Sequence, residues 1–114
     1  YVNAHGTSTR QNDISEARGL QRLLGDAVDR VPVSSTKSSM GHLVAACGAV
    51  EAIITLWSLR QRVAPPTLNL HRPDPLCALH HVPLVPRELR RGQVGLSNAF
   101  GFGGANATLA LVAP

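Results

Sequence analysis

One segment restricts the folds open to this chain more than any other. Residues 43–60 are apolar almost all the way round a helix, and Pro65 prevents that helix from continuing far beyond them. A helix without a polar face has to be buried on most of its sides. The run also contains Glu51, Thr55 and Ser58 and is too short to cross a membrane. The sequence therefore predicts an interior helix, covered from both sides in a layered domain.

The other periodicities place strands and one further helix around this segment. Residues 12–24 carry apolar side chains at helical spacing, begin at Asn12 and Asp13 with Glu16 close to a capping-box position, and end at Gly25. Short extended segments are expected at residues 1–4, 31–36, 82–85, 93–99 and 107–113. The loop between the last two, residues 100–104, is too short for a crossover helix, so those strands must pair antiparallel. The pattern predicts an α/β domain with a mixed sheet.

Composition excludes several classes of function. The net charge of +4 comes from ten Arg and one Lys against seven acidic residues, and four aromatic residues are too few to stack on bases. Nucleic-acid binding is therefore not expected, whereas the basic surface favours an acidic protein partner. Cys47 and Cys77 do not have metal-ligand spacing, so no metal is expected.

The start of the chain suggests that it was cut from a longer protein. The sequence begins with Tyr1 and has its only Met at Met40, and it offers little to cover the second side of the apolar helix. No signal peptide is visible, which favours a cytoplasmic location. We therefore expect a missing partner half.

Polar residues gather where apolar elements end. At the ends of strands in an α/β sheet, such residues commonly form a site, so we expect His5, Lys37, His42 and the glycine loop to converge. Two neutral imidazoles can donate to one developing oxyanion, a nearby ammonium keeps both rings neutral, and Glu51 can neutralise that ammonium. The three segments concerned are NAHGTST (3–9), SSTKSSMGH (34–42) and NAFGFGG (98–104).

Each of these residues also has a structural interpretation. His5 could be an ordinary strand-end residue, Lys37 a solvated cation, Glu51 an outward-facing helix residue, and residues 100–104 a hinge. Only their joint occurrence favours a site. Surface positions are expected for His71, His80 and His81, and Cys47 is expected to be a small core residue rather than a nucleophile.

Together these segments resemble a known family. The three motifs, with SSTKSSMGHLVAACGAVEA, PPTLNL and NAFGFGGANA in order, resemble the C-terminal half of a β-ketoacyl-acyl carrier protein synthase over essentially all 114 residues. The resemblance implies a thiolase-like fold, in which two similar halves, each a mixed sheet flanked by helices, form an αβαβα stack. Residues 1–114 would then be the C-terminal domain without its first strand and helix and without the whole N-terminal half.

The resemblance also implies a reaction. In this family an acyl group is held on a Cys thioester, malonyl-acyl carrier protein loses CO₂, and the carbanion attacks the acyl carbonyl. By motif position, His5 and His42 match the catalytic histidines, Lys37 the motif lysine and Glu51 its carboxylate partner.

Substrate contacts are implied in the same way. Thr7 and Thr9 match residues that contact the phosphopantetheine arm, and Phe102, between Gly101 and Gly103, matches a gating residue whose backbone N–H helps to form an oxyanion hole. The substrate would arrive on acyl carrier protein, with no cofactor bound by this chain. A homodimer is implied, or a heterodimer for a polyketide enzyme.

Two departures limit the resemblance. The family's nucleophilic Cys belongs to the N-terminal half, and Cys47 does not occupy its position, so the isolated chain should not catalyse condensation. In residues 9–13, TRQND resembles aromatic or aryl-polyene polyketide enzymes, whereas NAFGFGGAN resembles the fatty-acid type. A non-catalytic carrier-protein-binding or chain-length subunit and an inactive remnant are the alternatives.

Overall fold

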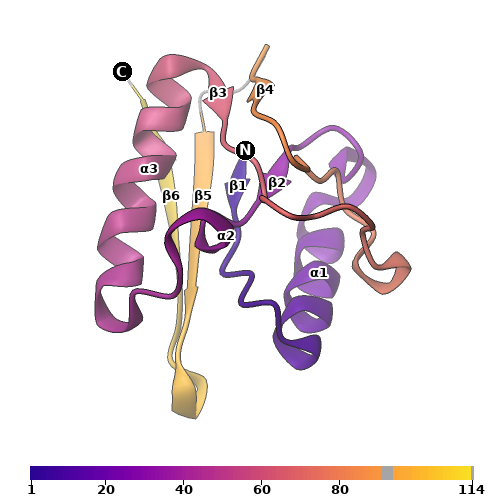
Figure 1. The fold of residues 1–114 in the computed structure, drawn as a ribbon, viewed down its shortest axis with the longest axis vertical. Coiled ribbons are helices and arrows are strands. Elements are labelled where there is room, and N and C mark those ends of the chain that lie inside the picture. The colour runs from indigo at the N-terminus through magenta and orange to yellow at the C-terminus, as the bar shows by residue number, and fades with distance from the viewer. Residues whose placement is uncertain (91–93, 114) are drawn as a thin grey trace.

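The fold was obtained as a computed structural model, which describes residues 1–90 and 94–113. Strands and helices alternate along the first two thirds of the chain, and a long hairpin closes it (Figure 1). The elements are β1 (Val2–Asn3), α1 (Arg10–Leu24), β2 (Val33–Ser34), α2 (Lys37–Met40), α3 (Cys47–Gln61), β3 (Val63–Ala64), β4 (Arg87–Glu88), β5 (Val94–Phe100) and β6 (Asn106–Val112).

The main sheet has the order β2-β1-β5-β6. β1 pairs in parallel with both β2 and β5, so that Val2 lies between Val33 and Leu96. β5 and β6 pair antiparallel over seven residues each. The mixed sheet and the antiparallel closing pair agree with the sequence prediction, although Gln93, the first residue of the predicted strand 93–99, lies outside the described residues.

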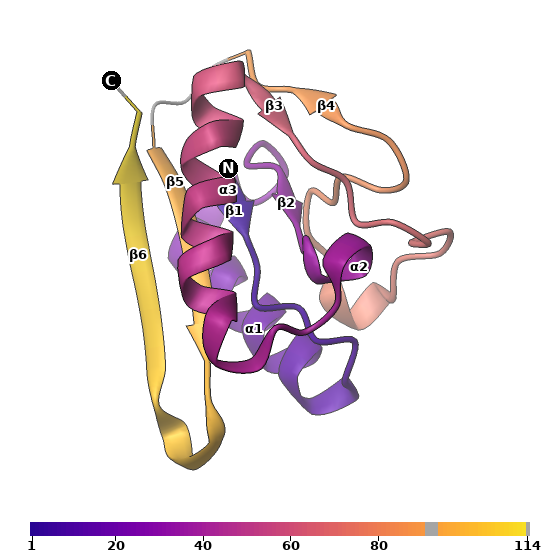
Figure 2. The same ribbon diagram turned by 60° about the vertical axis from the view of Figure 1, so that its left-hand side comes forward.

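The two long helices cover opposite faces of this sheet. Successive residues of a strand point to opposite faces. Val2 accordingly packs in one buried cluster with Leu20 of α1, and Tyr1 packs in another with Leu59 of α3. Figure 2 shows α3 in front of the strands and α1 behind them. The short central strand β1 therefore delivers its C-terminal end between the two helices.

Helix α1 begins earlier than predicted. Its N-cap is Thr9, and no side chain caps the helix. The expected start at Asn12 and Asp13 is therefore wrong, and Glu16 does not complete a capping box. Its carboxylate instead accepts hydrogen bonds from the segment that follows β1. The predicted end is confirmed, since Gly25 has a φ of +51° and terminates the helix.

Helix α3 differs from prediction in its start and its burial. A 3-10 turn precedes it, and the α-helix itself begins at Cys47. The expectation of burial on most sides is wrong for this chain, because Ile53 and Trp57 are each 63% exposed. The inner face instead buries Glu51 and Thr55, which are 1% and 0% exposed. The helix packs against β5 and β6 of the main sheet, and the apolar side chains of Ile53 and Trp57 remain largely exposed.

A small second sheet was not predicted from the sequence. β3, which follows α3 directly, pairs antiparallel with β4, which precedes the closing hairpin. The expected extended segment 82–85 is only partly formed: Pro83 bridges to Thr67, whereas Leu84 has a φ of +62°. Among the described residues, no helix is both long and apolar enough to span a membrane.

The contact between α3 and β5 predicts a stability test at Gly95. A Cβ at this position would lie 2.7 Å from Thr55 Cγ2 and 3.2 Å from Leu59 Cδ1. Thr55 cannot rotate freely, since its hydroxyl donates to Glu51 O at 2.7 Å. Gly95→Ala should therefore lower the free energy of unfolding, measured in urea, by about 1–3 kcal/mol.

Gly19→Ala is the matched control for this substitution. Gly19 lies within α1 and has no heavy atom within 4 Å of its hypothetical Cβ. Alanine there should raise the free energy of unfolding by about 0.5–1 kcal/mol through helix propensity. Equal effects of the two substitutions would contradict the packing assigned to Gly95.

Candidate active site

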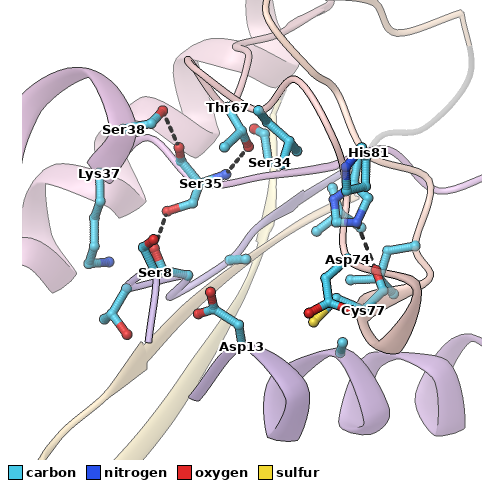
Figure 3. A pocket seen from close by; sticks show the side chains of 18 of the residues that line it. Ser8, Asp13, Ser34, Ser35, Lys37, Ser38, Thr67, Asp74, Cys77 and His81 are labelled. Atoms are coloured by element: carbon cyan, nitrogen blue, oxygen red, sulfur yellow. Dashed lines mark hydrogen bonds between the residues drawn. The ribbon is translucent and has the colours of Figure 1, made fainter. Parts of the chain in front are cut away.

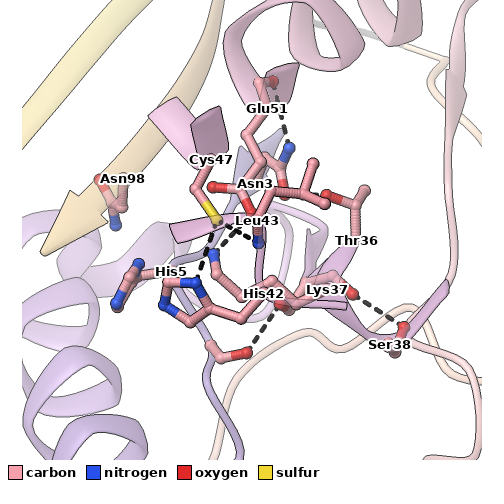
Figure 4. A network of polar contacts seen from close by, with 12 residues as sticks. Asn3, His5, Thr36, Lys37, Ser38, His42, Leu43, Cys47, Glu51 and Asn98 are labelled. Carbon is pink, nitrogen blue, oxygen red and sulfur yellow. Dashed lines mark hydrogen bonds and ion pairs between the residues drawn. The ribbon is translucent and has the colours of Figure 1, made fainter. Parts of the chain in front are cut away.

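The two motif histidines meet beside the C-terminal end of β1. His5 follows β1 and is 6% exposed, whereas His42 follows α2 and is exposed. Their ring centroids are 5.6 Å apart and the rings are nearly perpendicular, with Phe100 5.4 Å from His5 on another side. Figure 4 shows both imidazoles near Cys47 and the start of α3. The structure thus brings together the ends of three segments that are distant in sequence.

A buried carboxylate holds the His5 turn in place. Glu16 Oε1 accepts the backbone N–H of His5 at 2.8 Å and the side-chain amide of Asn98 at 2.9 Å, and Oε2 accepts the N–H of Gly6 at 2.8 Å. Glu16 is itself 7% exposed. Sequence reasoning missed this role, and the only signal was an acidic residue early in the helix after the motif.

Gly6 is required by the same turn. It has a φ of +38°, and a Cβ there would lie 2.6 Å from Ser35 Cβ. The Ser35 hydroxyl donates to Gly6 O at 2.8 Å, so the two strand ends are linked directly. A side chain at position 6 would separate the two segments that carry the histidines.

Lys37 and Glu51 form a buried ion pair. The ammonium nitrogen of Lys37 donates to Glu51 Oε1 at 2.5 Å, and the side chains are 5% and 1% exposed. The predicted pairing is confirmed. Glu51 Oε2 is buried and has no hydrogen-bond partner among the described residues. Asn3 donates to Glu51 O at 3.3 Å, which ties the ion pair back to β1.

The surroundings of His5 favour its neutral form. Burial lowers the pKa of His5 from its ordinary value, and the nearby Lys37 ammonium lowers it further, while the Glu16 carboxylate acts in the opposite direction. His5 Nδ1 is buried and has no hydrogen-bond partner among the described residues. A neutral imidazole can donate one N–H, so this ring is suited to bind a substrate oxygen.

The proton of His42 can be placed from its surroundings. The backbone N–H of Val44 donates to His42 Nδ1 at 3.0 Å. Because Nδ1 accepts this bond, the proton of the neutral ring lies on Nε2. The two rings lie beside a buried ammonium, as the motifs predicted.

The residues predicted to contact substrate lie in the turn after His5 and at the tip of the β5–β6 hairpin. Thr7 and Thr9 contact each other through their hydroxyl oxygens at 2.9 Å. Thr7 and His42 line a cavity of about 550 Å³. Figure 3 shows Lys37 on one side of this cavity and Asp74 on the other. Phe102, with Gly101 and Gly103, lies at the tip of the β5–β6 hairpin, where its side chain is fully exposed. Of this loop, Phe100 lies beside His5, with ring centroids 5.4 Å apart.

The burial of the other histidines agrees only in part with the sequence predictions. His71 is exposed as predicted, but His80 and His81 are half-buried, because His80 accepts a hydrogen bond from Arg87 and His81 contacts the Cys77 carbonyl. Cys47 is 3% exposed, which confirms the predicted buried position. In the described part of the chain, no group of three or more His, Cys, Asp or Glu residues could hold a metal ion.

Comparison with known proteins identifies the family. The family model described as the C-terminal domain of beta-ketoacyl synthase matches residues 1–71. The chain belongs to the beta-ketoacyl synthase family. It is 49% identical over 110 residues to 3-oxoacyl-(acyl-carrier-protein) synthase 2 of Synechocystis sp., covering 96% of this chain and 26% of the relative. It is 46% identical over 114 residues to the granaticin polyketide putative beta-ketoacyl synthase 1 of Streptomyces violaceoruber, covering 100% and 27%.

Solved structures confirm the fold. The chain is similar, with a TM-score of 0.93 and 32% identity, to a chain of the AntDE:AntF structure, a type II polyketide synthase acyl-carrier protein in complex with its ketosynthase bound to the hexaketide. The match covers 100% of this chain and 28% of that one. The beta-ketoacyl synthase chain therefore has the C-terminal part of a thiolase-like fold, as predicted. It spans about a quarter of the length of the curated relatives it matches.

The buried ion pair predicts a non-additive stability effect. Lys37→Met leaves the Glu51 carboxylate buried without its cation and should lower the free energy of unfolding by about 3–5 kcal/mol. The double substitution Lys37→Met with Glu51→Leu removes both charges and should recover most of that loss. Urea unfolding of the two variants measures the difference. A double variant less stable than Lys37→Met would contradict a compensated charge pair.

The lowered pKa of His5 predicts a pH dependence of stability. Between the folded-state pKa and the ordinary value of about 6.5, the unfolded chain binds a proton that the folded chain does not. Stability should therefore fall as the pH drops below about 6.5. Unfolding free energies measured across this range should fall less steeply in His5→Gln. An unchanged slope would show that His5 does not carry the effect.

Proposed function

We propose that this chain supplies the decarboxylation half of the active site of a condensing enzyme in fatty-acid or polyketide synthesis. The observation that carries the proposal is the pair of imidazoles, with ring centroids 5.6 Å apart, beside a buried ammonium. The donor pair is suited to hold an oxygen on which negative charge develops. The overall reaction would be a 3-oxoacyl-acyl carrier protein synthase reaction, a decarboxylative Claisen condensation.

The histidines would act when malonyl-acyl carrier protein loses CO₂. As the bond between the α-carbon and the carboxylate breaks, its electron pair moves into the thioester to form an enolate. His5 and His42 would donate N–H groups to that enolate oxygen, and neither needs to give up its proton. The enolate carbon would then attack an acyl thioester, and the nucleophilic sulfur would leave as thiolate. Lys37 would keep the pair neutral, and Glu51 would compensate the charge of Lys37.

Substrate delivery would involve the hydroxyl-rich turn after His5. Thr7 and Thr9 would hydrogen-bond the phosphopantetheine arm of acyl carrier protein, because Thr7 lines the cavity close after His5 and the Thr9 hydroxyl contacts that of Thr7. Phe102 would gate the acyl chain, and its glycine neighbours Gly101 and Gly103 would give the loop the freedom to move. No bound cofactor is needed for this chemistry.

The nucleophile and the rest of the fold would come from an N-terminal half. The exposed apolar residues of α3, Ile53 and Trp57, would pack against that half. The isolated chain would therefore be inactive, since no acyl-enzyme can form without the nucleophilic thiolate. A dimer, homodimeric or heterodimeric, would follow from membership of the family.

A non-catalytic carrier-protein-binding subunit is the second candidate, and an inactive remnant is the third. A subunit that only binds carrier protein does not need two enolate donors, so the retained histidine pair favours the enzyme. The residue at the nucleophile position of the N-terminal half distinguishes the first two. Absence of any N-terminal half in the gene would favour the remnant.

Replacing either histidine tests the proposal. His5→Ala or His42→Ala in the full-length polypeptide should reduce malonyl-acyl carrier protein decarboxylation by about 10²–10³-fold, because each removes one preorganised donor. The control is His71→Ala, which changes an exposed histidine outside the site and should leave the rate unchanged. Release of CO₂ is the measurement. Near-normal rates in both site variants would refute the assigned role.

A further inference from the structure

We propose that Cys47 is a positioning residue for His42, which holds the imidazole with its proton on Nε2. The inference rests on the proposed function for its catalytic consequence, but not for its structural content. Cys47 is the first residue of α3 and is buried, 3% exposed, directly beneath the loop that carries His42.

The thiol makes two contacts with that loop. Cys47 Sγ accepts the backbone N–H of Leu43 at 3.1 Å and lies 3.3 Å from His42 Nδ1. Figure 4 shows the sulfur between the imidazole and the Leu43 backbone, with both contacts drawn. One side chain therefore contacts both the catalytic ring and the backbone of the residue after it.

The loop needs such an anchor. Val44 has a φ of +51°, a left-handed conformation that β-branched residues rarely adopt, and its side chain is 78% exposed. This strained turn aims the Val44 N–H at His42 Nδ1. Since residues 41–46 are all exposed, burial does little to hold the turn, and hydrogen bonds must do so.

The Val44 N–H is the contact that selects the tautomer. It can only donate to Nδ1, whereas the Cys47 thiol can donate to this nitrogen or accept from it. A proton on Nδ1 would face the Val44 N–H, so the tautomer with the proton on Nε2 is favoured as long as the turn holds Val44 in place. Without the sulfur, Leu43 N–H would lose its acceptor, the strained turn could relax, and the Val44 contact would weaken. Cys47 therefore prepares His42 to donate without touching the substrate.

The test compares Cys47→Ala with Cys47→Ser in the full-length polypeptide. Alanine removes the donor and the acceptor, whereas serine keeps both in a smaller atom. The tautomer of His42 is read from imidazole spectra of ¹⁵N-histidine-labelled protein at about pH 8, where an unperturbed imidazole is neutral. His42→Gln assigns the signal. Release of CO₂ from malonyl-acyl carrier protein is measured in parallel.

Ser58→Ala is the matched control. Ser58 lies on the same helix, is 7% exposed, and loses a hydrogen bond to Ile54 O when replaced. It is about 16 Å along the helix axis from Cys47. The control therefore reports any general effect of weakening α3.

Cys47→Ala should move a detectable share of the His42 proton to Nδ1 and slow decarboxylation about fivefold, the factor that corresponds to one net hydrogen bond. Cys47→Ser should restore the Nε2 proton and most of the rate, and Ser58→Ala should change neither. An unchanged tautomer in Cys47→Ala overturns the proposal, whatever the rate.

Two further outcomes are distinguishable. If the wild-type protein releases no CO₂ but Cys47→Ala still shifts the tautomer, the proposed function fails and the positioning role stands. If Cys47→Ala does not fold, Cys47→Ser decides: retention of the Nε2 proton supports the role, and loss of it overturns the role.

Discussion

A single buried carboxylate connects the parts of the molecule that form the site. Glu16 lies on α1, yet its two oxygens accept hydrogen bonds from the backbone after β1 and from Asn98 on β5. Asn98 in turn accepts from Thr108 on β6 at 2.9 Å, so the connection runs across to the edge strand. β1 has only two residues and could not hold His5 in place through its ladder alone. The position of His5 therefore depends on a helix residue that has no part in the chemistry.

The second constraint is the charge balance of the interior. Lys37 and Glu51 are both buried, and their mutual contact offsets part of the cost of removing each charge from water. The ammonium nevertheless influences the site, since it contributes to the lowered pKa of His5. A fixed positive charge beside the two imidazoles creates a local potential that favours a developing anion. The ion pair and the histidines therefore act as one electrostatic unit.

Helix α3 has an unusual distribution of buried and exposed side chains. α3 turns Glu51 and Thr55 towards the sheet and leaves Ile53 and Trp57 exposed, the reverse of an ordinary amphipathic helix. Glu51 makes specific hydrogen bonds to Asn3 of β1 and Lys37 of α2, whereas the Thr55 hydroxyl donates back to Glu51 O within α3. In the proposed full-length enzyme the exposed apolar face would be covered, and the helix would then be buried on both sides, as its composition demands.

The sequence by itself determined the order of the two long helices and the strands of the main sheet, the antiparallel hairpin and the convergence of His5, Lys37 and His42. These follow from local causes: hydrophobic period, glycine and proline positions, and the rule that strand ends meet at one edge of a sheet. The pairing of Glu51 with Lys37 was also predictable, because a carboxylate on an apolar helix needs a partner. Tertiary structure alone decided what Glu16 contacts, where α1 and α3 begin, and which face of α3 is buried. The contacts of Glu16 join residues as much as 82 positions apart, and the local pattern around Glu16 is equally compatible with a helix cap.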